Sequence, residues 1–290
     1  MSGSKQTGSR MTRGEESPDV REAPARVNIA RASITRVYDA LLGGKDNFQV
    51  DRDMMARFLS LDPGFVRVVQ DRRDFIMRAT RYLAGQLGVC QFLDVGATLP
   101  EKDNPHDVAQ RLNREATMVY VSMDPGVLAH GRAQVADNDR THMVEADFRN
   151  PQQLVEHPVV AKHLNFDEPV AVFVVSTLQH VRPESDPAGI LAGYVDLLAP
   201  GSYVVFGHWY DPGAEDPGLS ELAHDLNDVY RDAGVGAWPR SRAEIEGMLT
   251  GLELLDPGLA ILADWWPDGP RLHQLARSQH LALGAVGVKR

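Results

Sequence analysis

Three acidic residues, each placed just after a short apolar stretch, carry the clearest chemical signal in this sequence. Asp94 begins a turn with Gly96, Asp124 follows the next such stretch, and Asp147 precedes Phe148. A glycine lets a backbone approach a ligand closely, and carboxylates accept hydrogen bonds from hydroxyl and amino groups. Asp124 has the spacing of an acid that binds a ribose hydroxyl pair, while Asp147 and Phe148 suit an adenine amino group and ring. The three positions together predict one adenosine-binding site.

A purely structural explanation exists for two of these acids. Asp124 and Asp147 are each followed closely by a proline, which is typical of a residue that caps the next helix. The Asp94-Val95-Gly96 turn is also a common joint between a strand and a helix. Capping and ligand binding therefore both remain open for Asp124 and Asp147.

The elements that would bring these acids together alternate between short apolar runs and helix-length amphipathic stretches. This alternation indicates βαβ units around a parallel sheet buried on both faces. Asn104-Pro105 and Asp186-Pro187 each supply a cap and a first-turn proline for an intervening helix. We expect strands over residues 89–95, 118–122, 142–145, 170–176 and 203–207, with a β-rich end at 252–255, 260–263 and 282–288.

The residues before the first strand divide into two parts. Residues 1–28 are rich in Gly, Ser, Pro and mixed charge without periodicity, which predicts a disordered tail. Residues 29–88 have helical periodicity, and we predict a helical N-terminal cap there, followed by a single cofactor-binding domain over 89–290. In this cap the apolar stripe around Tyr38 ends at Gly43-Gly44, and Asp51 is placed to cap a second helix.

From residue 30 to 289 the chain resembles a class I S-adenosylmethionine-dependent methyltransferase. It is similar to the actinobacterial S-adenosyl methyltransferase family, also classified as a domain of unknown function (DUF574). The most specific matching piece is Tyr-Asp-Ala-Leu-Leu-Gly-Gly-Lys-Asp-Asn-Phe at residues 38–48. The other matching pieces are Phe-Leu-Asp-Val-Gly at 92–96, Val-Glu-Ala-Asp at 144–147, Asp-Pro-Ala-Gly-Ile at 186–190 and Leu-Ala-Pro-Gly-Ser-Tyr at 198–203.

The resemblance implies an α/β fold of the Rossmann-like class I methyltransferase type. It has a seven-stranded, mostly parallel sheet with the last strand antiparallel, and a helical N-terminal cap. The implied cofactor is S-adenosyl-L-methionine, bound at the ends of strands one to four, with Tyr38 and Asn47 in a lid over it. The residues carried over as cofactor-binding are Asp94, Gly96, Ala97, Thr98, Ser122, Asp124, Pro125, Asp147, Phe148, Ser176, Tyr38 and Asn47.

The sequence departs from the family pattern at two of these positions. Thr98 occupies the place of a second glycine, where its Cβ narrows the space for the methionine part of the cofactor. Ser122 replaces an acid and offers a neutral hydrogen bond in place of a charge-assisted one. These departures keep a second hypothesis open, in which the protein is a catalytically inactive module of the same fold that senses a ligand or binds a partner protein.

Two histidines are candidates for a catalytic base. His180 lies just beyond the fourth predicted strand and His208 ends the fifth, so both fall on the edge where a substrate would bind. The alternative for each is a histidine that satisfies a local backbone group. The four tryptophans are candidates for an apolar substrate pocket or for the core: Trp209, Trp238, Trp265 and Trp266.

Composition limits the partners and the compartment. The formal charge of −10 comes without a run of basic residues, which argues against nucleic acid and favours a small-molecule substrate. Cys90 is the only cysteine, and the histidines lack ligand spacing, so we expect no metal site and a cytoplasmic location. The apolar stretches are too short for a membrane span. A nicotinamide dehydrogenase is disfavoured because the Gly-x-Gly-x-x-Gly phosphate loop is absent.

Overall fold

The computed structural model describes residues 27–99, 103–271 and 273–290. The tail predicted over residues 1–28 therefore falls almost wholly outside the described part of the chain. No helix among the described residues is long and apolar enough to cross a bilayer.

One mixed sheet organises the described part of the chain. Its strand order is β3-β2-β1-β4-β5-β8-β6, and β7 also pairs with β8. Strands β1 to β5 are parallel to one another, whereas β8 runs antiparallel to β5. The strands are β1 (Gln91–Asp94), β2 (Thr117–Ser122), β3 (Thr141–Glu145), β4 (Ala171–Val175), β5 (Tyr203–Trp209), β6 (Glu253–Leu254), β7 (Ala260–Ile261) and β8 (Ala282–Val288).

This order confirms the class I methyltransferase type of sheet. The antiparallel last strand is β8, inserted between β5 and β6. The described sheet has one strand more than the seven expected, because the short β7 also pairs with β8. Each of the eight stretches expected to form strands overlaps one observed strand.

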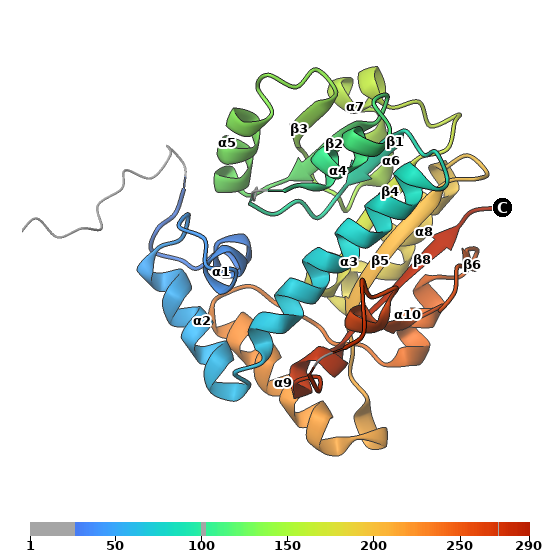
Figure 1. The fold of residues 1–290 in the computed structure, drawn as a ribbon. Coiled ribbons are helices and arrows are strands. Elements are labelled where there is room, and N and C mark those ends of the chain that lie inside the picture. Colours follow the sequence, from blue (N-terminus) through green and yellow to red (C-terminus); the bar gives the residue numbers. More distant parts are fainter. Residues whose placement is uncertain (1–26, 100–102, 272) are drawn as a thin grey trace, which may run out of the picture.

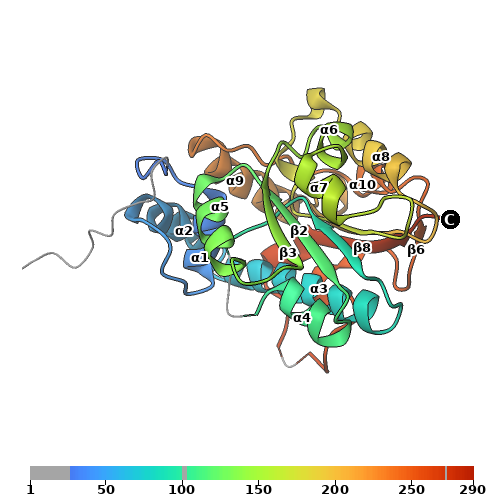
Figure 2. The same ribbon diagram turned by 90° about the horizontal axis from the view of Figure 1, so that it is seen from above.

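Helices cover both faces of the sheet, as Figures 1 and 2 show. One face carries α3 and α4, with α1, α2 and α9 beyond α3, and the other carries α6, α7, α8 and α10. The helices are α1 (Ile34–Leu41), α2 (Gln49–Leu61), α3 (Phe65–Gly85), α4 (Pro105–Leu112), α5 (Pro125–Gln134), α6 (Pro151–Val155), α7 (Pro158–His163), α8 (Pro187–Leu197), α9 (Pro217–Asp232) and α10 (Arg242–Met248).

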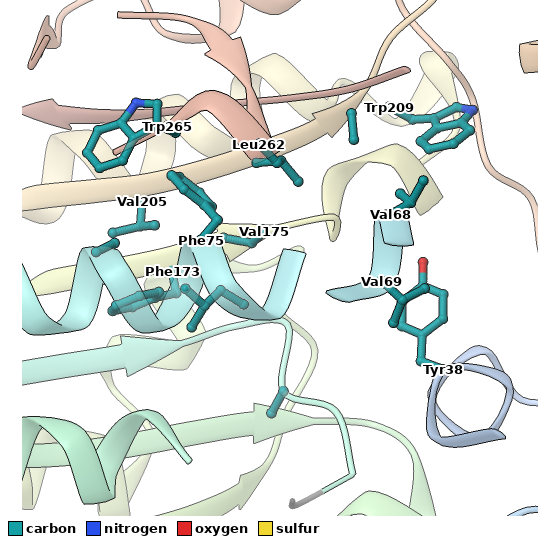
Figure 3. Packing of buried hydrophobic residues seen from close by; sticks show 14 of the residues in the cluster. Tyr38, Val68, Val69, Phe75, Phe173, Val175, Val205, Trp209, Leu262 and Trp265 are labelled. Carbon is teal, nitrogen blue, oxygen red and sulfur yellow. The ribbon is translucent and has the colours of Figure 1, made fainter. Parts of the chain in front are cut away.

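Successive strand residues point into different cores because side chains alternate across a strand. Phe92 packs in the core on the α3 side, and its neighbour Leu93 packs in the core on the α8 side. On the α3 side, Phe75 contacts Trp265 edge to face, with ring centroids 5.2 Å apart, and lies close to Phe173 of β4 (Figure 3). The strands are thus buried on both faces, as the continuous apolar runs predicted.

The helix starts predicted at Asn104 and Asp186 are confirmed, whereas the one predicted at Asp51 lies three residues earlier, with Phe48 as the N-cap. Asn104 is the N-cap of α4, and the Asp186 carboxylate accepts from the Gly189 N–H at the start of α8. Helix α2 begins at Gln49, two residues before Asp51. The Asp51 carboxylate therefore caps from inside the first turn, accepting from the Phe48 N–H at 2.9 Å.

The N-terminal helices share a core with the sheet. Tyr38 of α1, Phe58 of α2 and Phe75 of α3 belong to the same apolar cluster as Phe173. A buried ion pair fixes the first two helices, because Asp51 accepts from Arg36 Nε at 2.7 Å. The domain boundary near residue 88 stays a prediction.

Candidate functional site

A pocket lies where the carboxyl ends of β1 and β2 meet α1, α3 and the start of α4. It spans about 570 Å³ including its solvent-open mouth. Tyr38 of α1, Arg72 of α3, Asp94 of β1, Thr98 and Tyr120 of β2 are among its walls. The ends of parallel strands are where ligands bind in open α/β sheets. We call this space the strand-end pocket.

Asp94 presents one free carboxylate oxygen to this pocket. Its Oδ1 accepts from the Gly96 N–H at 2.9 Å, and Oδ2 has no hydrogen-bond partner among the described residues. Burial raises the pKa of Asp94, against the smaller effects of the Gly96 amide and the Arg72 charge. A donor or a cation that reached Oδ2 would restore part of the solvation that burial removes.

Arg72 supplies the positive charge of the pocket. Its guanidinium donates to the carbonyl oxygens of Gly96 at 3.1 Å and Val175 at 3.2 Å, so it bridges the ends of β1 and β4. It forms no salt bridge with any described residue. Sequence reasoning missed Arg72, although the apolar stripe of α3 holds a signal: a charged residue stands on its buried face, between Val69 and Phe75.

Gly96 is required where the β1 turn passes the end of β4. A Cβ at this position would lie 2.2 Å from Thr177 Oγ1, far inside contact distance. The glycine thus keeps the turn close enough for its carbonyl to accept from Arg72. Ala97, the next residue, turns its side chain into the core on the α3 side.

A second groove continues from the strand-end pocket along the end of α1. Tyr38, Leu42, Thr98 and Leu99 line both spaces, and residues 43–46 form the far wall. Gly43 ends α1 with φ +78°, a conformation that favours glycine. Tyr38 lines both spaces, and its role as part of a lid over the cofactor stays a prediction.

Asn47 is instead bonded within its own loop. It donates to Asp39 Oδ2 at 2.7 Å and to the Gly44 carbonyl, and it accepts from Arg52. These contacts hold the 43–48 loop against α1. The role of Asn47 as a cofactor contact stays a prediction.

Asp124 is engaged by the protein itself in this structure. Oδ1 accepts from the backbone of Gly126 and Val127, so this acid does cap α5, and Pro125 is the first residue of that helix. Oδ2 accepts from Ser33 Oγ at 2.5 Å and from Thr35 Oγ1 at 3.2 Å. Ser122, two residues earlier, accepts from the Asp124 N–H at 3.1 Å and so fixes the turn. Thr35 also lines the groove beside α1, so Asp124 lies one hydrogen bond beyond it.

Asp147 is engaged as well, but it caps no helix. Arg149 donates to its two carboxylate oxygens from Nε and Nη2, and these contacts lower the pKa of Asp147. The N-cap of α6 is Asn150. Phe148 packs against the core on the α8 side, and its carbonyl accepts from Tyr194. Neither Asp147 nor Phe148 lines the strand-end pocket.

Ser176 lies in a different, more enclosed pocket behind Arg72. Ser176 follows β4 with φ 57°, an uncommon conformation for a residue with a side chain. This enclosed pocket shares Tyr38, Val69 and Arg72 with the strand-end pocket. Ser176 and Asp94 thus lie in neighbouring pockets that share these three side chains as a common wall.

The two candidate histidines have different surroundings. His208 is buried with both ring nitrogens bonded, Nδ1 to the Trp209 carbonyl at 2.8 Å and Nε2 to Arg240 at 2.8 Å. Burial, reinforced by the Arg240 charge, lowers the pKa of His208 to about 3. The ring is therefore neutral at pH 7 and has no nitrogen free to take a proton from a substrate.

His180, at the end of the short helix Leu178–His180, keeps one nitrogen available. Nδ1 donates to the Gly236 carbonyl at 2.7 Å, which leaves Nε2 unprotonated in the neutral ring. Burial lowers the pKa of His180, the Gly236 carbonyl opposes that shift, and the Arg72 charge adds to it. Nε2 has no hydrogen-bond partner in the described part of the chain.

Across residues 27–99, 103–271 and 273–290, no three His, Cys, Asp or Glu side chains cluster closely enough to hold an ion.

Comparison with known proteins identifies the family. The model of the S-adenosyl methyltransferase family matches residues 20–290. A candidate methyltransferase from Thermobifida fusca YX is 36% identical, with 93% of this chain and 99% of that chain covered and a TM-score of 0.85. A DUF574 family protein from Streptomyces avermitilis MA-4680 is 29% identical, with 91% and 100% covered and a TM-score of 0.85. A comparison with curated proteins finds no match.

The family match covers nearly the whole chain, and the two solved structures share its fold over 93% and 91% of its length. The cofactor is S-adenosylmethionine, as the resemblance implied. The chain belongs to the S-adenosyl methyltransferase family.

Proposed function

We propose that this protein is an active enzyme that transfers the methyl group of S-adenosylmethionine to a small molecule in the cytoplasm. The observation that carries the proposal is the pair of opposite charges in the strand-end pocket, Asp94 and Arg72. The methionine part of the cofactor has an ammonium group and a carboxylate. A free carboxylate oxygen and a guanidinium without a salt-bridge partner among the described residues complement these two groups.

The donor chemistry of the pocket thus fits the methionine end of the cofactor. Asp94 Oδ2 would accept from the ammonium group, and Arg72 would donate to the carboxylate. Tyr38 and Thr98 line the pocket and the adjoining groove, and they would enclose the aliphatic part of the methionine. When bound, S-adenosylmethionine supplies an electrophilic methyl group on a sulfonium sulfur.

At the nucleoside end the fit requires an exchange of partners. Two hydroxyl groups, those of Ser33 and Thr35, meet on Asp124 Oδ2. A ribose presents the same chemistry, two neighbouring hydroxyls, and we expect it to replace them. Asp147 would likewise exchange a bond with Arg149 for the adenine amino group. The roles of Ser122, Pro125 and Phe148 are then to position these two acids.

His180 is the base that we assign to the acceptor. Its Nε2 holds the lone pair in a ring that burial keeps neutral, and Tyr230 packs edge to face against that ring. A proton released by the acceptor's hydroxyl or amine passes to Nε2, while the Gly236 carbonyl fixes the tautomer. His208, with both nitrogens bonded, would support the wall of the site rather than transfer protons.

Calorimetric titration with S-adenosylhomocysteine tests the proposed cofactor site. The wild-type chain is expected to bind it, and Asp94→Asn is expected to weaken binding about tenfold or more, since one charge-assisted hydrogen bond becomes neutral. Asp167→Asn is the matched control, because Asp167 is exposed and lies before β4, at the opposite edge of the sheet. Absence of binding at millimolar ligand would refute the proposal and favour the inactive-module alternative. Release of S-adenosylhomocysteine during incubation with S-adenosylmethionine and cell extract would then test turnover.

A further inference from the structure

The enclosed pocket behind Arg72 holds two buried polar groups that nothing in the described protein satisfies. Gln179 is 2% exposed and Trp209 is 4% exposed, and both line this pocket. Gln179 Oε1 and Trp209 Nε1 have no hydrogen-bond partner. Buried polar groups in folded proteins are nearly always bonded, because each unpaired one costs about 1–3 kcal/mol.

The two groups come from distant parts of the chain to one small space. Gln179 lies just after β4 and Trp209 ends β5, so both stand at the edge of the sheet where Asp94 also lies. The pocket spans about 300 Å³ with its mouth, and in this conformation the open space takes one small polar group. Figure 3 shows Tyr38 and Trp209 on either side of Val68, and all three line the pocket.

The wall shared with the strand-end pocket connects this space to the cofactor site. Tyr38, Val69 and Arg72 line both pockets. These three side chains fill the path between the two spaces, so they would shift for an acceptor bound against Gln179 and Trp209 to reach the methyl group of the cofactor. The Tyr38 and Tyr230 hydroxyls, 3.2 Å apart, both line the enclosed pocket and would part to admit a larger molecule.

The chemistry of the walls selects the ligand. Trp209 Nε1 is a donor only, so the ligand must accept there, and a hydroxyl can also donate to the Gln179 amide. Of the described residues that line the pocket, none carries a carboxylate, whereas Arg72 carries a positive charge. A cationic amine would therefore lack a counter-charge and be repelled. The rings of Tyr38, Phe65, Trp209 and Tyr230 offer flat apolar surface to a planar molecule.

We infer that this pocket binds the methyl acceptor and that the acceptor is a planar aromatic molecule with a hydroxyl group. The inference rests on the proposed function and names its substrate class. The hydroxyl accepts from Trp209 Nε1 and donates to Gln179, while the aromatic ring lies between Tyr38 and Tyr230. On methyl transfer the hydroxyl gives up its hydrogen bond to Gln179, and its proton passes to His180 Nε2, the base assigned to the acceptor. Arg72 stabilises the negative charge that develops on the oxygen.

Ligand-observed NMR titration of the full chain, with S-adenosylhomocysteine present, tests the inference. The probes are phenol, toluene, which has the same shape without the hydroxyl, and benzylamine, which is cationic. Phenol is expected to bind about tenfold more tightly than toluene or benzylamine, the effect of about one hydrogen bond. Equal binding of phenol and toluene, tighter binding of benzylamine, or no phenol binding at millimolar concentration would each overturn the inference.

Two variants test whether the preference for phenol over toluene arises in this pocket. Gln179→Leu and Trp209→Phe each remove one unpaired group, and each is expected to reduce the preference for phenol over toluene severalfold. Trp265→Phe is the matched control, because Trp265 is a buried tryptophan of the same core that does not line the pocket. It should retain the full preference. A preference that survives both Gln179→Leu and Trp209→Phe would place phenol elsewhere and overturn the inference.

The same titrations separate this inference from the proposed function. S-adenosylhomocysteine binding without a preference for phenol would leave the proposed function standing and remove the acceptor assignment. A preference for phenol that persists when S-adenosylhomocysteine fails to bind would show a hydroxyl-binding pocket in a protein that does not use this cofactor.

Discussion

Acidification is expected to destabilise this protein through His208. The folded-state pKa of His208 is about 3, because the ring is buried beside Arg240. In the unfolded chain a histidine has a pKa of about 6.5. Between these two values the unfolded state binds a proton that the folded state does not, so the free energy of unfolding falls as the pH drops below about 6.5.

The magnitude follows from the distance between the pH and the unfolded pKa. At about pH 4.5, two units below about 6.5 and still above the folded value, His208 alone should lower the free energy of unfolding by about 2.7 kcal/mol. Other buried histidines with lowered pKa values, such as His106, add to the total fall in stability. The His208 contribution must therefore be isolated by substitution.

His208→Gln isolates this contribution, because an amide cannot take the proton and can still accept from Arg240. Urea unfolding followed by far-UV circular dichroism at about pH 7 and about pH 4.5 gives the loss of stability for each protein. The loss for His208→Gln should be smaller than the wild-type loss by about 2.7 kcal/mol. Thr80→Val, a substitution at a buried residue without a titratable group, should lose as much as the wild type. Equal losses for wild type and His208→Gln would refute the assignment of a neutral, buried His208.

Two further substitutions test the site. Gly96→Ala places a Cβ 2.2 Å from Thr177 Oγ1 and should lower the free energy of unfolding by about 1–3 kcal/mol, whereas Thr177→Ala in the same chain should restore most of that loss. Urea unfolding of the two single variants and the double variant measures the coupling, and strictly additive effects would contradict the contact. His180→Gln should slow the release of S-adenosylhomocysteine by about a hundredfold at saturating S-adenosylmethionine with cofactor affinity unchanged, and a rate close to wild type would remove His180 as the base.

Local signals predicted the fold well. The Asn104-Pro105 and Asp186-Pro187 pairs start helices at the expected residues, since a side-chain cap and a proline act on the nearest turn alone. The runs of apolar residues gave the strands, although β1 is shorter than expected, Gln91–Asp94 against 89–95. Such boundaries depend on pairing with neighbouring strands, which no local pattern contains.

The candidate site was predicted less completely. Asp94, Thr98 and Tyr38 were expected at the cofactor and do line one pocket. For Asp124 the two readings left open, cap and ligand contact, are not exclusive, because one oxygen caps α5 and the other accepts from Ser33 and Thr35. Ser33 and Thr35 precede Asp124 by 91 and 89 residues in the chain, and only the fold brings their hydroxyls to its carboxylate.

The sequence by itself determined the order of helices and strands, and with it the edge of the sheet at which Asp94 and the two histidines stand. It did so because caps, glycines and apolar periodicity act over a few residues. Only the tertiary structure decided which buried polar groups are left without a hydrogen-bond partner in the described part of the chain. Arg72, Gln179 and Trp209 line one pocket because α3, β4 and β5 meet around them, and burial leaves Gln179 Oε1 and Trp209 Nε1 without a partner among the described residues.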